Sequence, residues 1–104
     1  MAAGRIIRSF ASPTNEPAGL TFDGRCLFNS DYTNDRIYQI DPETGRVIRF
    51  SPAYAFEPNG LTFDGRCLWL VDYTNDLICQ VDPETWQIIR SFAAPAANPY
   101  DMAF

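Results

Sequence analysis

The stretch Gly19-Leu-Thr-Phe-Asp-Gly-Arg-Cys-Leu27 returns 41 residues later as Gly60-Leu-Thr-Phe-Asp-Gly-Arg-Cys-Leu68. The same shift relates residues 31–35 to residues 72–76, both Asp-Tyr-Thr-Asn-Asp, and 25 of the 40 residues in 19–58 are identical in 60–99. A period kept without a slip indicates a chain built from copies of one supersecondary unit. Identity this high is typical of recent duplication or of deliberate construction, and the sequence leaves both open.

Each copy has a strand-like pattern. Short apolar runs rich in aromatic and β-branched residues alternate with clusters of Gly, Pro, Asn and Asp, and no helical periodicity competes. Four strands are predicted per copy, at 19–22, 25–31, 36–40 and 46–50 and again at 60–63, 66–72, 77–81 and 87–92. Asp23-Gly24 suits a tight hairpin, and Asp41-Pro-Glu-Thr44 suits a type I turn. Consecutive hairpins predict an antiparallel meander.

The second strand of the second copy, Cys67-Leu-Trp-Leu-Val71, is apolar on both faces, so both faces of its sheet need covering. Four-stranded meanders of about 40 residues covered on both faces are typical of β-propeller blades, which stack around a central axis. The alternative, a two-sheet sandwich, favours one polar face per strand and gives no reason for a constant repeat. The sequence therefore predicts an all-β protein made of propeller blades.

The repeat also resembles known blades. The segments 60–69, 72–76 and 78–85 are similar to the blade repeats of bacterial propellers related to the NHL, YncE-like, streptogramin-lyase-like and glutamine-cyclotransferase-like families. The resemblance covers almost the whole chain and implies the propeller fold. Those families include lyases, lactonases and cyclotransferases beside non-enzymatic binding proteins, so no single activity is implied. The lyases are expected to use histidine, and this chain contains none.

Length limits how the ring is closed. Propellers typically have about four to eight blades, whereas two complete blades are expected here, at 19–50 and 60–92, with a lone outer strand at 5–10 and a lone inner strand at 100–104. Such a unit alone would expose two apolar faces and open strand edges. We expect homo-oligomerisation to complete the ring, with a dimer favoured. Strand exchange at the seam, a gap, a higher oligomer and a fragment of a longer propeller are the alternatives.

Composition limits the partners. The formal net charge of -5 disfavours nucleic acid and anionic membranes, because phosphate groups attract basic surfaces. No apolar run approaches the length of a membrane span, so a soluble protein is predicted. The first residues lead straight into a strand, which predicts no signal peptide and leaves the compartment open. Cys26, Cys67 and Cys79 have no metal-type spacing and are predicted to be buried free thiols rather than a disulfide or zinc site.

The turns after the second strands and the loops between blades are expected at one end of the ring, where propellers commonly bind ligands. This candidate rim comprises Asp31, Tyr32, Asn34, Asp35, Asp72, Tyr73, Asn75, Asp76, Glu16, Glu57 and Asn59. Its repeated part is either a hairpin turn whose Asp and Asn side chains bond their own backbone or an acidic and aromatic rim for a cation or a sugar. The regular spacing of a dedicated calcium loop is absent, and no metal site or cofactor is predicted.

No catalytic residue is predicted. Histidine and lysine are absent, and no Ser or Cys nucleophile has a visible base partner, which removes the usual triads. Glu16 or Glu57 beside an Asp of a neighbouring turn could still form an acid and base pair. The residues that break the repeat are Asn29 and Ser30 opposite Leu70 and Val71, and Gly45 opposite Trp86. The polar pair at 29 and 30 marks a wet seam between blades or a pocket, with the seam favoured.

Three hypotheses follow, in order. The first is a self-assembling propeller scaffold that has no specific ligand and no enzymatic activity. The second is a multivalent module that binds glycans or small molecules. The third is a fragment of a propeller enzyme of the lyase or cyclotransferase type.

Overall fold

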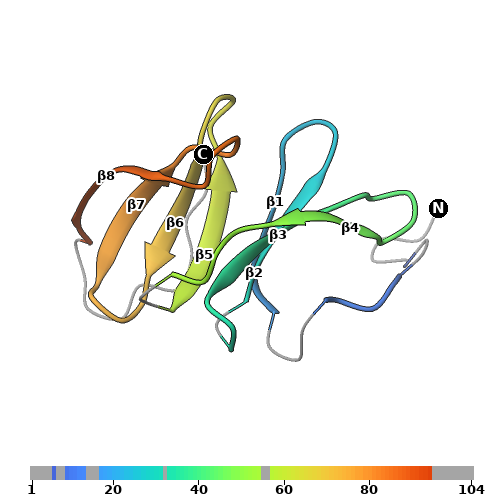
Figure 1. Cartoon of the computed structure of the whole chain (residues 1–104), viewed down its shortest axis with the longest axis horizontal. Coiled ribbons are helices and arrows are strands. Elements are labelled where there is room, and N and C mark those ends of the chain that lie inside the picture. The colour runs from blue at the N-terminus through green and yellow to red at the C-terminus, as the bar shows by residue number, and fades with distance from the viewer. Residues whose placement is uncertain (1–5, 7–8, 14–16, 32, 55–56, 95–104) are drawn as a thin grey trace.

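The computed structural model describes residues 6, 9–13, 17–31, 33–54 and 57–94, which form two four-stranded antiparallel sheets (Figure 1). Blade 1 contains β1 (Pro17–Phe22), β2 (Leu27–Asp31), β3 (Arg36–Ile40) and β4 (Val47–Phe50), in that order across the sheet. Blade 2 contains β5 (Pro58–Phe63), β6 (Leu68–Asp72), β7 (Leu77–Val81) and β8 (Ile88–Ala93), in the same order. Within this described part, no helix is long and apolar enough to cross a membrane.

The number and order of the strands confirm the predicted meander, and β3 and β7 have the predicted bounds. β2 and β6 begin two residues later than predicted. In blade 1 the Oδ1 atom of Asp23 accepts hydrogen bonds from the backbone N–H groups of Arg25 (2.8 Å) and Cys26 (2.7 Å), which keeps both residues in the hairpin loop. Asp64 makes the same two bonds in blade 2. The loop expected at Asp23-Gly24 therefore extends over 23–26.

The turn predicted at 41–44 extends by one residue in each blade. The backbone N–H of Gly45 donates to the carbonyl oxygen of Asp41 (2.8 Å), and Trp86 repeats this bond to Asp82 (2.7 Å). Gly45 and Trp86 have φ angles of 77° and 68°, in the left-handed region. This conformation costs a residue with a Cβ about 1–2 kcal/mol. At Trp86 core packing offsets the cost, because its ring is buried with its centroid 6.2 Å from that of Phe28.

The blades meet through their inner strands, since β1 lies against β5. Phe28 and Ile37 of blade 1 pack into an apolar core with six buried residues of blade 2, which are Leu61, Leu68, Leu70, Cys79, Val81 and Trp86. Gly19 permits the close approach of the two inner strands, because a Cβ at this position would overlap the carbonyl oxygen of Asn59. The contact between the blades is therefore the hydrophobic core of the chain.

Alternation along the strands gives each blade two different faces. Phe28, Ser30 and Ile37 face blade 2, so the residues between them in register lie on the opposite side of blade 1. We call that side the open face; its residues are Leu20, Phe22, Leu27, Asn29, Tyr38, Ile40 and Phe50. The repeat counterparts of Leu20 and Asn29 are Leu61 and Leu70, which lie in the core. Equivalent faces of the two blades therefore have different surroundings.

The lone terminal strands remain predictions. Of the outer strand expected at 5–10, the described residues Ile6, Ser9 and Phe10 have no strand pairing. The inner strand expected at 100–104 lies outside the described residues.

Candidate functional site

The candidate rim begins with two buried carboxylates at the ends of β2 and β6. Asp31 accepts hydrogen bonds from the backbone N–H of Thr33 (2.9 Å) and from Nδ2 of Asn34 (2.9 Å). Asp72 accepts the backbone N–H and the Nδ2 of Asn75, at 2.9 and 3.0 Å. The two asparagines are exposed, and both aspartates hold their own turns. This arrangement supports the interpretation of the repeated segment as a hairpin turn stabilised by its Asp and Asn side chains.

Asp35 and Asp76 close these turns in the left-handed conformation, with φ angles of 57° and 55°. Burial raises the pKa of Asp35, and the negative charge of Asp31 adds to the rise. Burial also raises the pKa of Tyr38, followed by the charge of Asp31, whose Oδ2 atom accepts the Tyr38 hydroxyl at 3.3 Å. The Asp31 oxygens are thus engaged by donors from within blade 1. This engagement weighs against a cation at the turn, because a cation needs free oxygen ligands.

The loop between the blades meets the β6–β7 turn at the same end of the molecule. The carbonyl oxygen of Glu57 accepts the backbone N–H of Tyr73 (3.0 Å), and the Glu57 N–H donates to Oγ1 of Thr74 (2.9 Å). Asn59 lies within β5 rather than in a loop as predicted, and its carbonyl oxygen accepts the Ser30 hydroxyl. Tyr32 and Glu16 lie outside the described residues. The structure brings Glu57 to Tyr73, and a ligand at the rim stays a prediction.

The cysteines are free and differ in burial. Cys79 is buried as predicted, and burial raises the pKa of its thiol to about 11, with the charge of Asp72 adding to the rise. The prediction was wrong for Cys26 and Cys67, which are half-buried because they end the hairpin loops and lie outside the strands. Among the described residues, no group of three or more Cys, Asp or Glu side chains could hold a metal ion.

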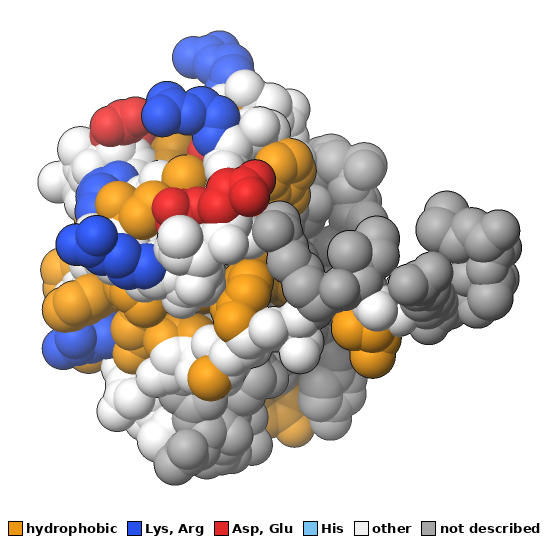
Figure 2. Space-filling view, turned by 90° about the vertical axis from the view of Figure 1, so that its right-hand side faces the viewer, with side chains coloured by type: hydrophobic (Ala, Val, Ile, Leu, Met, Phe, Trp, Pro, Cys, Tyr) orange, Lys and Arg blue, Asp and Glu red, His pale blue; other side chains and the backbone are white. Residues whose placement is uncertain are grey.

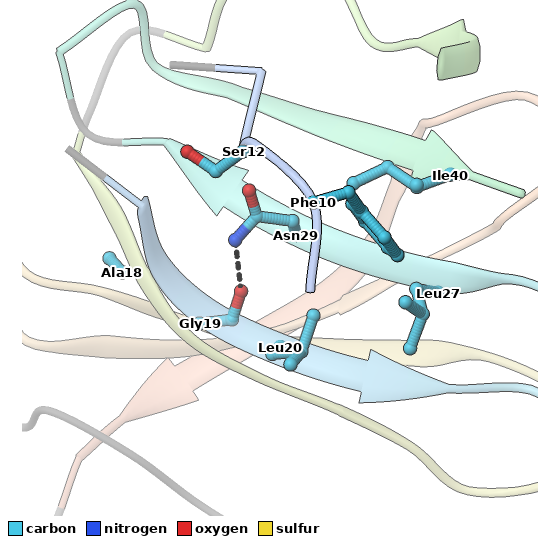
Figure 3. A pocket seen from close by; sticks show the side chains of 8 residues that line it. All are labelled: Phe10, Ser12, Ala18, Gly19, Leu20, Leu27, Asn29 and Ile40. Atoms are coloured by element: carbon cyan, nitrogen blue, oxygen red, sulfur yellow. Dashed lines mark hydrogen bonds between the residues drawn. The ribbon is translucent and has the colours of Figure 1, made fainter. Parts of the chain in front are cut away.

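A pocket of about 300 Å³ lies on the open face of blade 1 (Figure 3). Its lining residues are Phe10, Ser12, Ala18, Gly19, Leu20, Leu27, Asn29 and Ile40. Nδ2 of Asn29 donates to the carbonyl oxygens of Gly19 (2.8 Å) and Ser30 (3.3 Å), which fixes the orientation of the amide. Its Oδ1 atom points toward the Ser12 side of the pocket and has no hydrogen-bond partner in the described structure, although Asn29 is only 5% exposed. The pocket is therefore apolar with one unsatisfied acceptor.

The two residues that break the repeat in β2 divide the roles expected of them. Asn29 lines the pocket, whereas Ser30 lies at the contact between blades, where its hydroxyl donates to the carbonyl oxygen of Asn59 and accepts the Gly19 N–H (2.8 Å). Together the two side chains bind both the N–H and the C=O of Gly19. They therefore also hold β1 at a point where its pairing with β2 is irregular.

The open face exposes several large apolar side chains. Leu20, Phe22 and Phe50 are 62%, 53% and 52% exposed. Figure 2 shows this side of the molecule, with hydrophobic side chains gathered between arginines. One of the arginines of the face is Arg36, whose guanidinium lies 4.9 Å from the centroid of the Phe50 ring. The sequence prediction did not single out these residues, although their apolar counterparts in the second copy mark a face built to be covered.

The comparisons with known proteins support the fold. No protein-family model and no curated protein sequence matches the chain. Among solved structures, the glutaminyl cyclase of Myxococcus xanthus superposes with a TM-score of 0.80 at 21% identity, over 96% of this chain and 43% of that protein. The virginiamycin B lyase of Staphylococcus aureus gives 0.65 at 21%, over 82% and 30%. The Pan2 WD40 domain of Neurospora crassa gives 0.61 at 16%, over 73% and 23%.

These similarities concern architecture. The chain spans less than half the length of each of these proteins. Identities this low show the fold alone, and they confirm the predicted resemblance to β-propeller blades. The chain is thus an all-β protein made of propeller blades, and the activities of the similar proteins remain their own.

Proposed function

We propose that the chain is a scaffold that self-assembles into a β-propeller, in which a further copy of the same chain covers the open face of blade 1. The observation that carries this proposal is the equivalence of the two blades. Each residue of the open face has a counterpart 41 residues later. The counterparts Leu61, Leu70 and Cys79 are packed against blade 1 in the core. The open face therefore has the layout of a face that another blade covers.

The exposed side chains give this covering its free energy. Leu20 is 62% exposed, whereas its counterpart Leu61 is 2% exposed. Burying a side chain of this size contributes about 1.5–3 kcal/mol, and Phe22 and Phe50 add two more large apolar groups on the same face. Part of the gain is lost to the entropic cost of association. The remainder favours a covered face.

A second surface of the chain has the complementary design. We call the side of blade 2 turned away from blade 1 the docking face; it carries Trp69, Ile78, Gln80 and Arg90, the counterparts of Phe28, Ile37, Gln39 and Arg49. Blade 1 uses those counterparts to contact blade 2. The open face and the docking face are different surfaces, so contact between copies is heterologous and gives a ring only where the rotation closes. A dimer is the smallest such ring.

Light scattering after size-exclusion chromatography tests self-assembly of the 104-residue chain. We expect a mass above the 11.8 kDa of one chain at micromolar concentration, falling on dilution. Leu20→Asp places a charge on the open face and should shift the protein to monomer. Gln87→Asp, at an exposed position of the β7–β8 loop, is the matched control and should leave the mass unchanged. A folded wild-type protein that stays monomeric at micromolar concentration would contradict the proposal.

The pocket favours a second candidate function, the binding of a small molecule. A buried acceptor without a donor costs about 1–3 kcal/mol, and a ligand with an apolar body and an N–H or O–H group would satisfy Oδ1 of Asn29. Such a ligand would compete with a docked copy, because the pocket lies on the open face. We expect indole to bind more tightly than indene, which lacks the N–H. Equal affinities, or unchanged indole binding to Asn29→Leu, would argue against this function.

The remaining alternatives rest on less. Binding of a glycan at the rim stays a prediction, and a glycan array is its direct test. The absence of enzymatic activity also stays a prediction, since two of the similar structures are named as enzymes.

A further inference from the structure

Arg49 is the polar anchor of the contact between the two blades of one chain. From β4, its Nη1 and Nη2 atoms donate to the carbonyl oxygens of Pro83 (3.1 Å) and Glu84 (2.8 Å) in the β7–β8 loop. Its guanidinium lies 4.7 Å from the centroid of the Trp86 ring, and Nη1 also donates to Oε1 of Gln39 (3.2 Å). One arginine thus binds the loop of the next blade through two carbonyl oxygens and an aromatic ring.

Arg90 is the counterpart of Arg49 in blade 2 and is held in a similar way. Its Nε atom donates to Oε1 of Gln80 (2.8 Å), the counterpart of Gln39. Its guanidinium lies 5.6 Å from the ring centroid of Trp69. Arg90 is exposed, and its terminal nitrogens donate to none of the residues that the structure describes. The docking face therefore carries an arginine that is positioned for a loop of a next blade.

Blade 1 offers a loop of the required design. Pro42 and Glu43, in the β3–β4 loop, are the counterparts of Pro83 and Glu84. The backbone follows the same turn, because Gly45 has nearly the φ angle of its counterpart Trp86. Two carbonyl oxygens are therefore available in the same arrangement. The loop is also acidic, which complements the charge of an incoming arginine.

The aromatic ring that Gly45 lacks is supplied by Phe10. A Cβ built on Gly45 would lie 2.6 Å from both Cγ and Cδ1 of Phe10, so the phenyl ring occupies the space where a side chain at 45 would begin. Figure 3 shows this ring beside Leu27 and Ile40 of the open face. Phe10 comes from the segment before blade 1 and stands where Trp86 stands in blade 2. The acceptor side of blade 1 is therefore complete only with Phe10 in place.

We propose that, in the assembled protein, Arg90 of one copy packs over Phe10 of a second copy and donates to the carbonyl oxygens of Pro42 and Glu43. This inference rests on the proposed self-assembly and specifies its seam. The seam between copies then repeats the seam within the chain, with Phe10 in the role of Trp86. It also fixes the register, because the β3–β4 loop of the second copy must lie next to β8 of the first.

The dissociation constant of self-association, measured by sedimentation velocity over a dilution series, tests the seam. Arg90→Ala should weaken assembly by roughly tenfold or more, through the loss of two charge-assisted hydrogen bonds and a cation–π contact. The melting temperature of the dissociated chain should stay unchanged, because Arg90 is exposed. Arg25→Ala removes a charge from the exposed β1–β2 loop and should leave the dissociation constant unchanged.

A rescue experiment tests the role of Phe10. Phe10→Ala removes the ring and Gly45→Trp collides with it, so each change alone should weaken assembly. The double variant rebuilds the arrangement of blade 2 and should bring the dissociation constant back to within about threefold of the wild-type value.

The outcomes separate the two proposals. A wild-type chain that stays monomeric overturns self-assembly itself. A wild-type chain that assembles, while Arg90→Ala has an unchanged dissociation constant, overturns only this seam. A double variant weaker than both single variants shows that Phe10 does not stand in for Trp86 and also overturns the seam as described.

Discussion

Blade 1 and blade 2 have most of their residues in common, but their equivalent faces have different neighbours. In blade 2, Leu61 and Leu70 face blade 1 and are buried in the shared core. In blade 1, the counterparts Leu20 and Asn29 lie on the open face, beside a pocket. The residues that recur therefore build the blade. The residues that differ adapt each face to what lies next to it.

The difference is clearest at the turn before the last strand of each blade. Trp86 adopts a left-handed backbone and is anchored by Phe28 and Arg49 across the seam. Gly45 adopts the same backbone without a side chain, and the ring of Phe10 takes up the space. Blade 2 thus accepts backbone strain in exchange for core packing, whereas blade 1 leaves the turn relaxed.

Leu70→Asn would remove the largest difference between the two faces by giving blade 2 the residue of blade 1. Leu70 is fully buried among apolar side chains, so the amide would lose its hydration and the core would lose packing. We expect the free energy of unfolding to fall by about 4 kcal/mol, measured by urea denaturation. A loss below about 1 kcal/mol would mean that the two faces are interchangeable.

The reciprocal variant Asn29→Leu is the matched control. It removes an acceptor that has no partner, but it also removes the amide bond to Gly19. Because the orphan acceptor is the more costly of the two, we expect a gain of about 1 kcal/mol. A loss instead of a gain would identify the hold on β1 as the main role of Asn29.

Trp86→Gly would give blade 2 the relaxed turn of blade 1. Loss of the buried ring costs about 3–5 kcal/mol, and relief of the left-handed backbone returns about 1–2 kcal/mol. The net loss should be about 2–3 kcal/mol in urea denaturation. Ile48→Ala, at a half-exposed position of β4, is the control and should change stability by less than 1 kcal/mol. A stable Trp86→Gly variant would show that the ring contributes little to the seam within the chain.

The same comparison shows what sequence can and cannot provide. The period and the strand pattern were sufficient to predict eight strands, two meanders and the propeller fold, because each depends on local periodicity and turn chemistry. Asn29 and Ser30 were recognised because they break the repeat. The loops that end at Cys26 and Cys67 were placed inside strands, since the bonds that extend the turn come from a side chain two or three residues away.

The candidate site was harder to predict for a physical reason. Asp31 and Asp72 looked like rim ligands by type and spacing, but the structure buries them under their own turns. The placement of Phe10 over Gly45 joins residues that are far apart in sequence and outside the repeat, and no local pattern encodes it.

The smallest predicted effect separates the two β-turns that end the second strands. Asp35 has a raised pKa because of burial and the nearby charge of Asp31, and its Oδ1 atom has no hydrogen-bond partner in the described structure. The folded state therefore binds this proton more tightly than the unfolded state. Stability from this group is highest below the ordinary pKa of 3.8 and falls as the pH rises through the raised value.

Asp35→Asn should accordingly raise the free energy of unfolding by a few tenths of a kcal/mol at pH 7, and this advantage should shrink on acidification below pH 3.8. Asparagine also tolerates the left-handed backbone, so Asp76→Asn, at the equivalent φ in blade 2, controls for that contribution. Urea denaturation at both pH values measures the difference. A gain that is the same at low and neutral pH would assign it to backbone preference and not to the charge of Asp35.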